Sequence, residues 1–415
     1  MQSGHERHGL IDSAPASLTT FLWGLSDDGR SSVVEDSIDL TVPDLATLHK
    51  RRSEKWSSEE PDVLASTVAE MDFPLASEVA AALHAAIDRH DLGYTPPRAT
   101  QLPAAFADFA RRRLGWTVDQ DQITLVPDVM AGLIELCRVL LTPGEKVAFF
   151  TPAYPPFFTE LPQAGAELVL LPLDAAAVVD LEALQQALRG GVRALVLTNP
   201  HNPTGRVLPR AELEQIADLC ASYDCWVLAD EIHAPLVLRG ALHTPWLEVS
   251  DAAREHGIAL TSASKAFNVA GLKAAFMITA SDRAREAVQR IPSLTDRVGL
   301  LGVIAAEAAF AHSDHWLDAV RDQLATNREL LGDLLAAELP KITWTPPDAS
   351  YLAWLDCRDL ELGEDPAERF RAQGRVALSR GMDYGRDGAG FVRLNFGTSP
   401  EHVTEAVRRM ALTRY

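Results

Sequence analysis

Residues 192–233, VRALVLTNPHNPTGRVLPRAELEQIADLCASYDCWVLADEIH, hold the clearest structural pattern in this chain of 415 residues. Two short apolar runs, Ala194–Leu197 and Trp226–Ala229, flank a segment with helical spacing at 210–222. Short apolar runs between helices are typical of strands that are buried on both faces of a parallel sheet. The stretch therefore predicts a strand–helix–strand unit of an α/β protein.

The same alternation extends on both sides of this unit. Helical patterns and short apolar runs continue to alternate at 76–90, 129–140, Val147–Phe150, Leu168–Leu171, 181–189 and Ile258–Leu260. A mostly parallel sheet covered on both faces accounts for this order. The pattern after residue 296 differs from this alternation, because two long helices come first, at 296–312 and 315–338. They are followed by strands at Ile342–Trp344 and Tyr351–Leu355, a helix at 366–380, a strand at Phe391–Leu394 and a closing helix. We therefore expect a smaller α+β domain to follow the α/β domain.

The composition fits a folded enzyme and disfavours several other classes of protein. Hydrophobic residues make up 47% and charged residues 23% of the chain, which is close to the average for globular proteins. Asp and Glu outnumber Lys and Arg by 58 to 38, and a net charge of −20 repels nucleic acids and anionic membranes. We find no apolar run long enough to span a membrane and no N-terminal signal pattern. We expect a cytoplasmic protein that binds neither nucleic acid nor membrane.

Common motifs for other chemistries are missing from the sequence. There is no GxxxxGK[ST], no GxGxxG after a strand, no HExxH and no GxSxG. His312 and His315 have a spacing that could hold a metal ion, but no third ligand accompanies them, so we interpret both as ordinary helix-surface residues and expect no metal. The four cysteines are scattered without CxxC spacing and are interpreted as reduced and mostly buried: Cys137, Cys220, Cys225 and Cys357.

Three unusual loops each follow a predicted strand: TNPHNPTG at 198–205, ADEIH at 229–233 and SASKAFNVAGLK at 262–273. In open α/β sheets, ligands bind beyond the carboxyl ends of the strands, which is where these loops begin. The ordered set resembles the fold type I, pyridoxal-5′-phosphate-dependent class I/II aminotransferase superfamily over most of residues 45–415. AEMDFP at 69–74, GYTPP at 93–97, TPAYPPF at 151–157, NPHNPTGR at 199–206 and DEIH at 230–233 further resemble the cystathionine β-lyase subfamily often called MalY/PatB.

The resemblance implies a fold and a division of the chain. The expected fold is a large domain with a mostly parallel seven-stranded sheet between helices, followed by a smaller α+β C-terminal domain. The expected division is a partly ordered extension at 1–45, a segment packing on the small domain at 46–75, the large cofactor-binding domain at 76–310 and the small domain at 311–415.

Two residues match the chemical centre of this superfamily. Pyridoxal phosphate withdraws electrons from bonds at the substrate Cα, which requires a lysine to hold the cofactor and a carboxylate to keep its ring nitrogen protonated. Lys265 in SASK matches that lysine, and its freed amine would then remove the Cα proton as general base. Asp230 matches the carboxylate and ends a predicted core strand, where a buried charge needs a partner of opposite sign.

Three further residues match positions around the cofactor ring. Asn202 matches the asparagine that donates to the phenolic oxygen, and prolines and a glycine around it make a rigid loop. His233 stands where many relatives have a tyrosine facing the same oxygen, although a satisfied core histidine is an alternative. Tyr154 matches the aromatic residue that stacks on the ring, with simple packing as the alternative. Asn202 and Tyr154 are also expected to contact the substrate.

The cofactor phosphate needs fixed donors at the other end of the site. Ser262 and Ser264 precede Lys265, while Val129 and Met130 begin a predicted helix whose free N–H groups could bind an anion. The other expected phosphate ligands are Lys273, where many relatives have arginine, and Tyr94, which the resemblance places in the neighbouring subunit and counts among the catalytic residues. A homodimer with active sites at the subunit interface follows from that implication.

Arg393 in FVRLNFGTSP matches the arginine that binds the substrate α-carboxylate, a task suited to a planar guanidinium. Three positions depart from the subfamily. Thr67 replaces a large aromatic residue and Glu70 an aspartate near the substrate entrance, which puts the substrate shape in doubt. Asp128 stands where glycine is expected; its side chain could cap the helix, but its charge disfavours a nearby phosphate.

Three functions are compatible with these residues. The leading hypothesis is a carbon–sulfur β-lyase that cleaves cystathionine or another cysteine S-conjugate to a thiol, pyruvate and ammonia. The alternative is an aminotransferase that uses the same residues on an α-amino acid. A non-catalytic regulator is disfavoured because Lys265, Asp230, Asn202 and Arg393 are all present.

Overall fold

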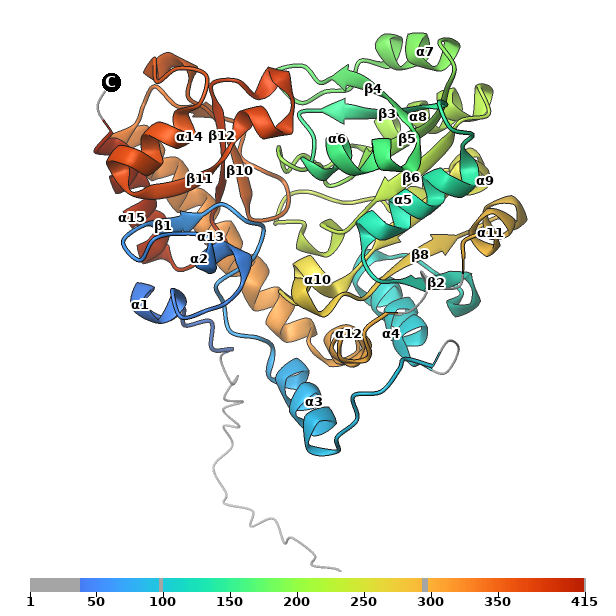
Figure 1. Ribbon diagram of the computed structural model, residues 1–415, viewed down its shortest axis with the longest axis horizontal. Helices are drawn as coiled ribbons and strands as arrows, with labels where there is room; N and C mark the ends of the chain where they lie inside the picture. Colours follow the sequence, from blue (N-terminus) through green and yellow to red (C-terminus); the bar gives the residue numbers. More distant parts are fainter. Residues whose placement is uncertain (1–37, 97–99, 293–297, 414–415) are drawn as a thin grey trace, which may run out of the picture. The chain divides into compact units, whose positions relative to one another are not determined.

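The computed structural model describes residues 38–96, 100–292 and 298–413, which belong to one compact unit (Figure 1). Most of the predicted extension at 1–45, Pro97 of GYTPP and the start of the predicted helix at 296 lie outside the described residues. Two sheets organise the rest, one with seven strands and one with five. The α/β class with an additional α+β part is therefore confirmed.

The seven-stranded sheet carries the three loops singled out in the sequence. Its order is β2-β8-β7-β6-β5-β3-β4, and within it only β8 runs antiparallel to its neighbours. The strands are β2 (Ile123–Val126), β3 (Lys146–Thr151), β4 (Glu167–Pro172), β5 (Val192–Thr198), β6 (Trp226–Asp230), β7 (Gly257–Thr261) and β8 (Ala275–Thr279). The apolar pattern predicted β3 to β7 but neither β2 nor β8.

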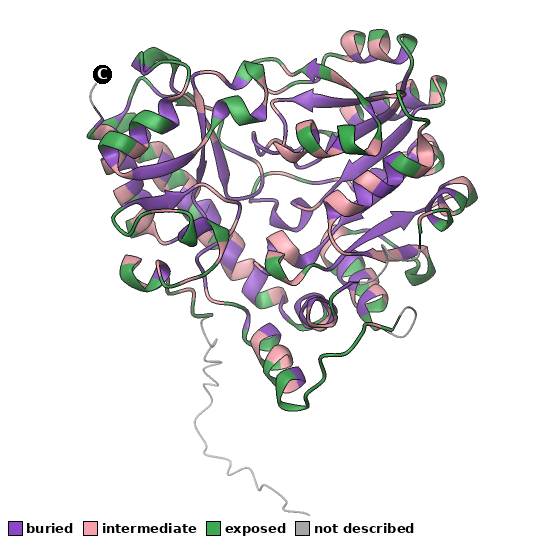
Figure 2. Ribbon diagram, viewed as in Figure 1, coloured by how far each residue is buried: buried purple, intermediate pink, exposed green. Residues whose placement is uncertain are grey.

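Helices cover both faces of this sheet. Because successive strand residues point to opposite faces, Leu195 and Leu197 of β5 join one apolar cluster, while Ala194 and Val196 join the other. Three helices contribute side chains to the apolar cluster that contains Ala194: α5 (Val129–Leu140), α6 (Pro156–Glu160) and α11 (Asp282–Gln289). Five helices contribute to the cluster that contains Leu195: α4 (Leu102–Phe109), α7 (Leu181–Arg189), α8 (Arg210–Ser222), α9 (Asp251–His256) and α12 (Leu300–His312). Figure 2 shows the central strands buried throughout.

The five-stranded sheet has the order β1-β11-β12-β10-β9 and joins distant parts of the chain. Its strands are β1 (Leu64–Ser66), β9 (Thr343–Trp344), β10 (Leu352–Asp356), β11 (Val376–Arg380) and β12 (Phe391–Asn395). The remaining helices are α1 (Leu45–Leu48), α2 (Glu54–Ser57), α3 (Ser77–Asp88), α10 (Ala263–Ala266), α13 (Asp314–Glu338), α14 (Pro366–Arg369) and α15 (Pro400–Ala411). β1 pairs with β11, so the N-terminal segment contributes an edge strand. The division at 75/76 and 310/311 stays a prediction.

The helix predicted at 366–380 is wrong beyond its first turns. The segment forms α14, a π-helical turn at Phe370–Gly374 and then β11, which pairs with both β1 and β12. A Cβ at Gly374 would lie 2.4 Å from the Arg409 carbonyl oxygen, and Arg375 has a φ of 56°. The close approach and the left-handed residue end the helix, and long-range strand pairing then outweighs local helix propensity.

Other expectations concern the cysteines, metals and membranes. All four cysteines are buried and free, as predicted. No cluster of metal-ligating side chains occurs among the residues that the structure describes, and His312 ends α12 next to α13, which contains His315. Within the described ranges, no helix has the length and apolar character that a membrane crossing requires.

Candidate active site

The predicted site residues come together at the carboxyl edge of the seven-stranded sheet. β5, β6 and β7 are parallel neighbours, and the loops that follow them carry Asn202, His233 and Lys265 (Figure 1). Asp230 is the last residue of β6, between the other two strands. The topology therefore explains why three separate loops of the sequence form one site.

Lys265 lies on the short helix α10, which begins just after β7. Its Nζ donates to the Ala69 carbonyl oxygen at 3.0 Å. Burial lowers the pKa of Lys265 to about 8, and the positive charge of Arg393 lowers it further, while Glu70 and Asp230 oppose the shift. A substantial fraction of this amine is therefore neutral near physiological pH, as a nucleophile or a base requires.

Asp230 is a buried carboxyl group in the same site. Burial raises its pKa to about 6, and the neighbouring Glu231 also raises it. The Ile232 N–H donates to Asp230 Oδ1 at 3.2 Å and acts in the opposite direction, as does the charge of Lys265. A group with this burial and these neighbours is suited to bind a positive charge, such as a protonated ring nitrogen.

His233 is a neutral side chain facing the same site. Burial lowers its pKa to about 3, and the charges of Lys265 and Arg393 lower it further. Its Nδ1 is buried and has no hydrogen-bond partner among the described residues. A buried nitrogen without a partner is costly in a packed interior, which favours a role for His233 toward a ligand over that of a satisfied core histidine.

Arg393 extends from β12 of the five-stranded sheet to a loop of the seven-stranded sheet. Its guanidinium donates to Asn202 Oδ1 at 3.1 Å, to the Thr67 carbonyl oxygen at 2.9 Å and to Ser379 Oγ at 3.2 Å. It also lies 5.0 Å from the centre of the Tyr384 ring, and its Nε has no hydrogen-bond partner in the described chain. The guanidinium is thus held in place for recognition of a carboxylate.

Tyr154 lies on the segment after β3. Burial raises its pKa, the charge of Asp230 raises it next, and that of Arg393 opposes the shift. These influences place the phenol near both residues. Its ring meets the Phe157 ring edge-on, with 5.7 Å between their centres. This contact is compatible with either stacking on a cofactor or simple packing.

A backbone segment at 67–72 covers Lys265; the resemblance placed Thr67 and Glu70 of this segment near the substrate entrance, but the sequence did not reveal the hydrogen bonds of its backbone. Its carbonyl oxygens accept hydrogen bonds from several side chains besides Lys265 and Arg393: Tyr351 donates to Ala69, Asn268 to Met71, and Asn395 to Val68 and Glu70. The sequence alone gives Asn395 no role. Backbone acceptors leave no trace in residue identity, so only the fold shows these contacts.

The same segment is attached through a buried ion pair. Lys55 Nζ lies 2.8 Å from Asp72 Oδ2, and Trp56 Nε1 donates to Asp72 Oδ1 at 2.7 Å. Both charged side chains are almost fully excluded from solvent. Removal of one partner would leave the other buried without compensation, a change that typically costs about 3–5 kcal/mol.

The predicted phosphate end is more open. Asp128 caps α5 by accepting from the Ala131 N–H at 2.7 Å, and its other oxygen pairs with Lys273 Nζ at 2.9 Å. The cap involves the N–H groups of Ala131 and Gly132, which leaves those of Val129 and Met130 at the helix start as predicted anion donors. Asp128 therefore does cap the helix, and its charge is partly compensated.

The two serines have a different arrangement from the one expected. The Ser262 hydroxyl donates to the Ala274 carbonyl oxygen at 2.7 Å and accepts from the Ser264 N–H at 3.0 Å. Ser262 thus caps α10, and donation to a phosphate would require its hydroxyl to rotate. The phosphate roles of both serines stay predictions.

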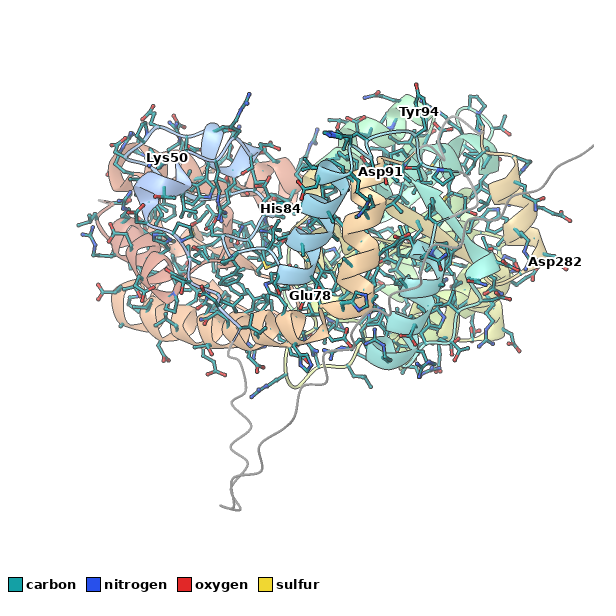
Figure 3. The ribbon with its side chains drawn as sticks, turned by 90° about the horizontal axis from the view of Figure 1, so that it is seen from below. Lys50, Glu78, His84, Asp91, Tyr94 and Asp282 are labelled. Carbon is teal, nitrogen blue, oxygen red and sulfur yellow. The ribbon has the colours of Figure 1, made fainter. Side chains whose placement is uncertain are left out.

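Tyr94 is the predicted residue that does not reach the site within this chain. Its side chain is 93% exposed. Figure 3 shows it at the surface, beyond the end of α3. Exposure of a large aromatic side chain agrees with an expected role in a neighbouring subunit.

The sequence matches the family model of aminotransferase class I and II over residues 55–410. The chain therefore belongs to this family, and the resemblance found in its loops is confirmed.

Curated relatives are similar over nearly the whole chain. A protein of Corynebacterium glutamicum named cystathionine beta-lyase is 36% identical, covering 90% of this chain and 99% of its own length. Cystathionine beta-lyase PatB of Bacillus subtilis is 34% identical, covering 84% and 92%. Among solved structures, cystalysin of Treponema denticola, which contains a pyridoxal 5′-phosphate cofactor, has a TM-score of 0.82 at 26% identity, covering 87% and 95%.

Proposed function

We propose that this protein is a pyridoxal-phosphate-dependent carbon–sulfur β-lyase that acts on cystathionine or a related cysteine S-conjugate. The observation that carries the proposal is the arrangement of a half-buried Lys265 with the buried Asp230 and Arg393, in which the pKa of the lysine is lowered to about 8. Relatives named cystathionine beta-lyase at 34–36% identity support the reaction type.

The residues present fit pyridoxal phosphate. Asp230 is a buried carboxyl group suited to a protonated ring nitrogen, and His233 Nδ1 and Arg393 Nε are buried polar atoms without partners in the described chain. Asn202 accepts through Oδ1 from Arg393, so its Nδ2 is the group left to donate. Lys265 would hold the cofactor, with Val129, Met130, Lys273 and the two serines at its phosphate. When bound, the cofactor supplies electron withdrawal from bonds at the substrate Cα.

The chain's own residues then have separate tasks. Arg393 binds the substrate α-carboxylate with a guanidinium already fixed by Asn202, Thr67 and Ser379. Lys265, as a neutral amine, takes the proton from Cα. The segment at 67–72 holds the amine in place, since the Ala69 carbonyl oxygen accepts a hydrogen bond from Lys265 Nζ. The Cβ–S bond then breaks, the thiol leaves with a proton, and addition of water releases pyruvate and ammonia.

A direct test uses the purified holoenzyme with L-cystathionine. We expect steady formation of pyruvate and a thiol in equal amounts, and loss of both in Lys265→Ala. Transfer of the amino group to a 2-oxo acid without pyruvate release would establish the aminotransferase alternative, because the same residues serve both reactions.

We further propose a homodimer in which Tyr94 of one protomer reaches the phosphate of the partner's site. Three large apolar side chains of one stretch, Ile87, Leu92 and Tyr94, are exposed on α3 and the segment after it. We expect sedimentation to give the mass of a dimer. Tyr94→Phe should weaken cofactor binding about tenfold, as loss of a hydrogen bond to a charged group implies. A monomer with full cofactor affinity would contradict the proposal.

A cytoplasmic location also stays a proposal. It is supported by four buried cysteines that form no disulfide among the described residues, as is usual in a reducing compartment.

A further inference from the structure

A buried polar chain of Asn199, His243 and Glu231 lies behind the cofactor loops. Asn199 belongs to the loop that carries Asn202, and Glu231 directly follows Asp230. His243 lies between β6 and α9, in a segment to which the sequence assigned no function. The three residues are 2%, 8% and 2% exposed. Buried polar groups are costly unless each has a partner, so their contacts are informative.

The contacts of Asn199 determine the protonation of His243. Asn199 Oδ1 accepts from the Leu208 N–H at 3.0 Å, so its Nδ2 faces His243 Nδ1 at 3.4 Å. An amide NH₂ group can only donate, so Nδ1 must be an acceptor without a proton. The proton of a neutral His243 is therefore on Nε2. A doubly protonated ring would direct an N–H at the amide donor.

The Nε2 proton of His243 faces a carboxylate. Nε2 lies 3.3 Å from Glu231 Oε1, the same oxygen that accepts from the Trp246 N–H at 2.6 Å. Nε2 makes no hydrogen bond to any described residue, so its contact with Glu231 is electrostatic. Glu231 in turn raises the pKa of the adjacent Asp230.

Backbone contacts of the same residues join three neighbouring strand ends. The Asn199 N–H donates to the Asp230 carbonyl oxygen at 3.0 Å, which ties β5 to β6. The Glu231 N–H donates to the Leu260 carbonyl oxygen at 2.9 Å, and Thr261 Oγ1 donates to that of Glu231 at 3.3 Å, which ties β6 to β7. Displacement of Asn199 and Glu231 would therefore move the loops of Asn202, His233 and Lys265 together.

We propose that Asn199, His243 and Glu231 form a positioning unit for the cofactor, in which neutral His243 links the Asn202 loop to Glu231 and Glu231 holds a negative charge beside Asp230. This inference rests on the proposed function, because it assigns Asp230 to the cofactor ring nitrogen. The added charge favours the protonated state of that nitrogen, although Glu231 itself does not touch it.

The test compares four variants by cofactor titration of the apoprotein and by the ¹⁵N chemical shift of pyridoxal phosphate labelled at its ring nitrogen. We expect Glu231→Gln and His243→Leu to weaken binding about tenfold or more, as loss of a charged contact implies, and to shift the ¹⁵N signal toward the unprotonated form. His243→Gln should retain most of the affinity, since glutamine has both an acceptor and a donor. Val249→Ala removes buried apolar atoms from the same segment and should leave both readouts unchanged.

The outcomes separate this inference from the proposed function. Failure of the wild-type apoprotein to bind the cofactor would overturn the proposed function. Normal binding by the wild type, with Glu231→Gln matching Val249→Ala in both readouts, would overturn the positioning unit alone. If the Glu231 variant does not fold, ¹⁵N spectra of the wild-type apoprotein still decide, because a His243 ring that is protonated on both nitrogens, or on Nδ1 alone, near pH 7 contradicts the unit.

Discussion

The floor of the site, formed by Asp230, His233, Lys265 and Arg393, contrasts with its rim, formed by Asp128, Lys273 and Tyr94. Asp230, His233 and Arg393 of the floor are buried and Lys265 is half-buried, and loss of contact with solvent is the main cause of the pKa shifts of Asp230, His233 and Lys265. At the rim, the side chain of Lys273 is 61% exposed, and Tyr94 is almost wholly exposed. The floor residues are therefore held in place within one chain, whereas the proposed phosphate site has more open contacts and, in our proposal, includes Tyr94 of a second subunit.

The largest loss of activity should follow from substitution of Lys265, because this residue of the floor takes part in the reaction. Lys265→Ala removes both the attachment of the cofactor and the general base, so lyase activity should fall by about 10³-fold or more. Pyruvate formation from L-cystathionine measures the loss, and the visible absorbance of the bound cofactor should change with it. Lys146→Ala, on the surface of β3, is the matched control. Activity above a tenth of wild type in Lys265→Ala would show that Lys265 is not the general base.

The second prediction concerns the stability of the apoprotein, in which the buried carboxyl group of Asp230 has no ligand. Its pKa rises from 3.8 in the unfolded chain to about 6, so between these values the folded apoprotein binds the extra proton and its stability falls as pH rises. The full loss is on the order of 3 kcal/mol above this window. We expect apo Asp230→Asn to lack this decrease and to be more stable than apo wild type near pH 8, while its activity is strongly reduced.

Urea unfolding of the two apoproteins at several pH values measures this difference. Parallel stability profiles for wild type and Asp230→Asn between about pH 4 and pH 7 would show that burial of the carboxyl group carries no such cost.

Glu70 lies in the segment at 67–72, outside the residues assigned to floor and rim, and its charge acts on Lys265 of the floor. Glu70 raises the pKa of Lys265, so Glu70→Gln should lower that pKa further below 8. Only the neutral amine captures the cofactor, so the pH midpoint for the capture rate should shift to lower pH by less than about one unit. Stopped-flow mixing of apoprotein with pyridoxal phosphate gives this midpoint. Glu78→Gln on α3 should leave it unchanged, and an upward shift in Glu70→Gln would contradict the sign.

The smallest effect is expected at the rim itself. Asp128→Asn keeps a residue that can cap α5, removes a negative charge near the phosphate and frees Lys273. Cofactor affinity should rise a few-fold at low ionic strength, and the gain should shrink with added salt, as for exposed charges. Fluorescence titration of the apoprotein at two salt concentrations measures both. Weaker binding in Asp128→Asn would mean that the ion pair with Lys273 helps to hold the phosphate site.

The sequence predicted the floor better than the rim for a physical reason. Asp230, Asn202 and Lys265 follow short apolar strands, and a parallel sheet brings the ends of such strands together without further information. Tyr94 cannot be placed from one chain, because its expected contact lies in another subunit. Thr67 and Glu70 of the covering segment were placed near the substrate entrance, but the contacts of this segment were missed because its backbone carbonyl oxygens, not its side chains, bind Lys265 and Arg393.

The fold shows the same limit. Helices α7 and α8 match the predicted ranges, since their apolar spacing is local. β11 was mistaken for helix, because the segment directly before it is helical up to Gly374 and because its pairing with β1 involves residues about 310 positions away. β2 and β8 were missed by the apolar pattern, although the family resemblance implied seven strands.

We propose that this site breaks the Cβ–S bond and does not merely exchange the amino group. The most direct measurement is the fate of the substrate and the cofactor when holoenzyme reacts with excess L-cystathionine and no 2-oxo acid. We expect many molecules of pyruvate per active site, with the cofactor returned to its starting form. Conversion of one equivalent of cofactor to pyridoxamine phosphate, without pyruvate, would contradict it.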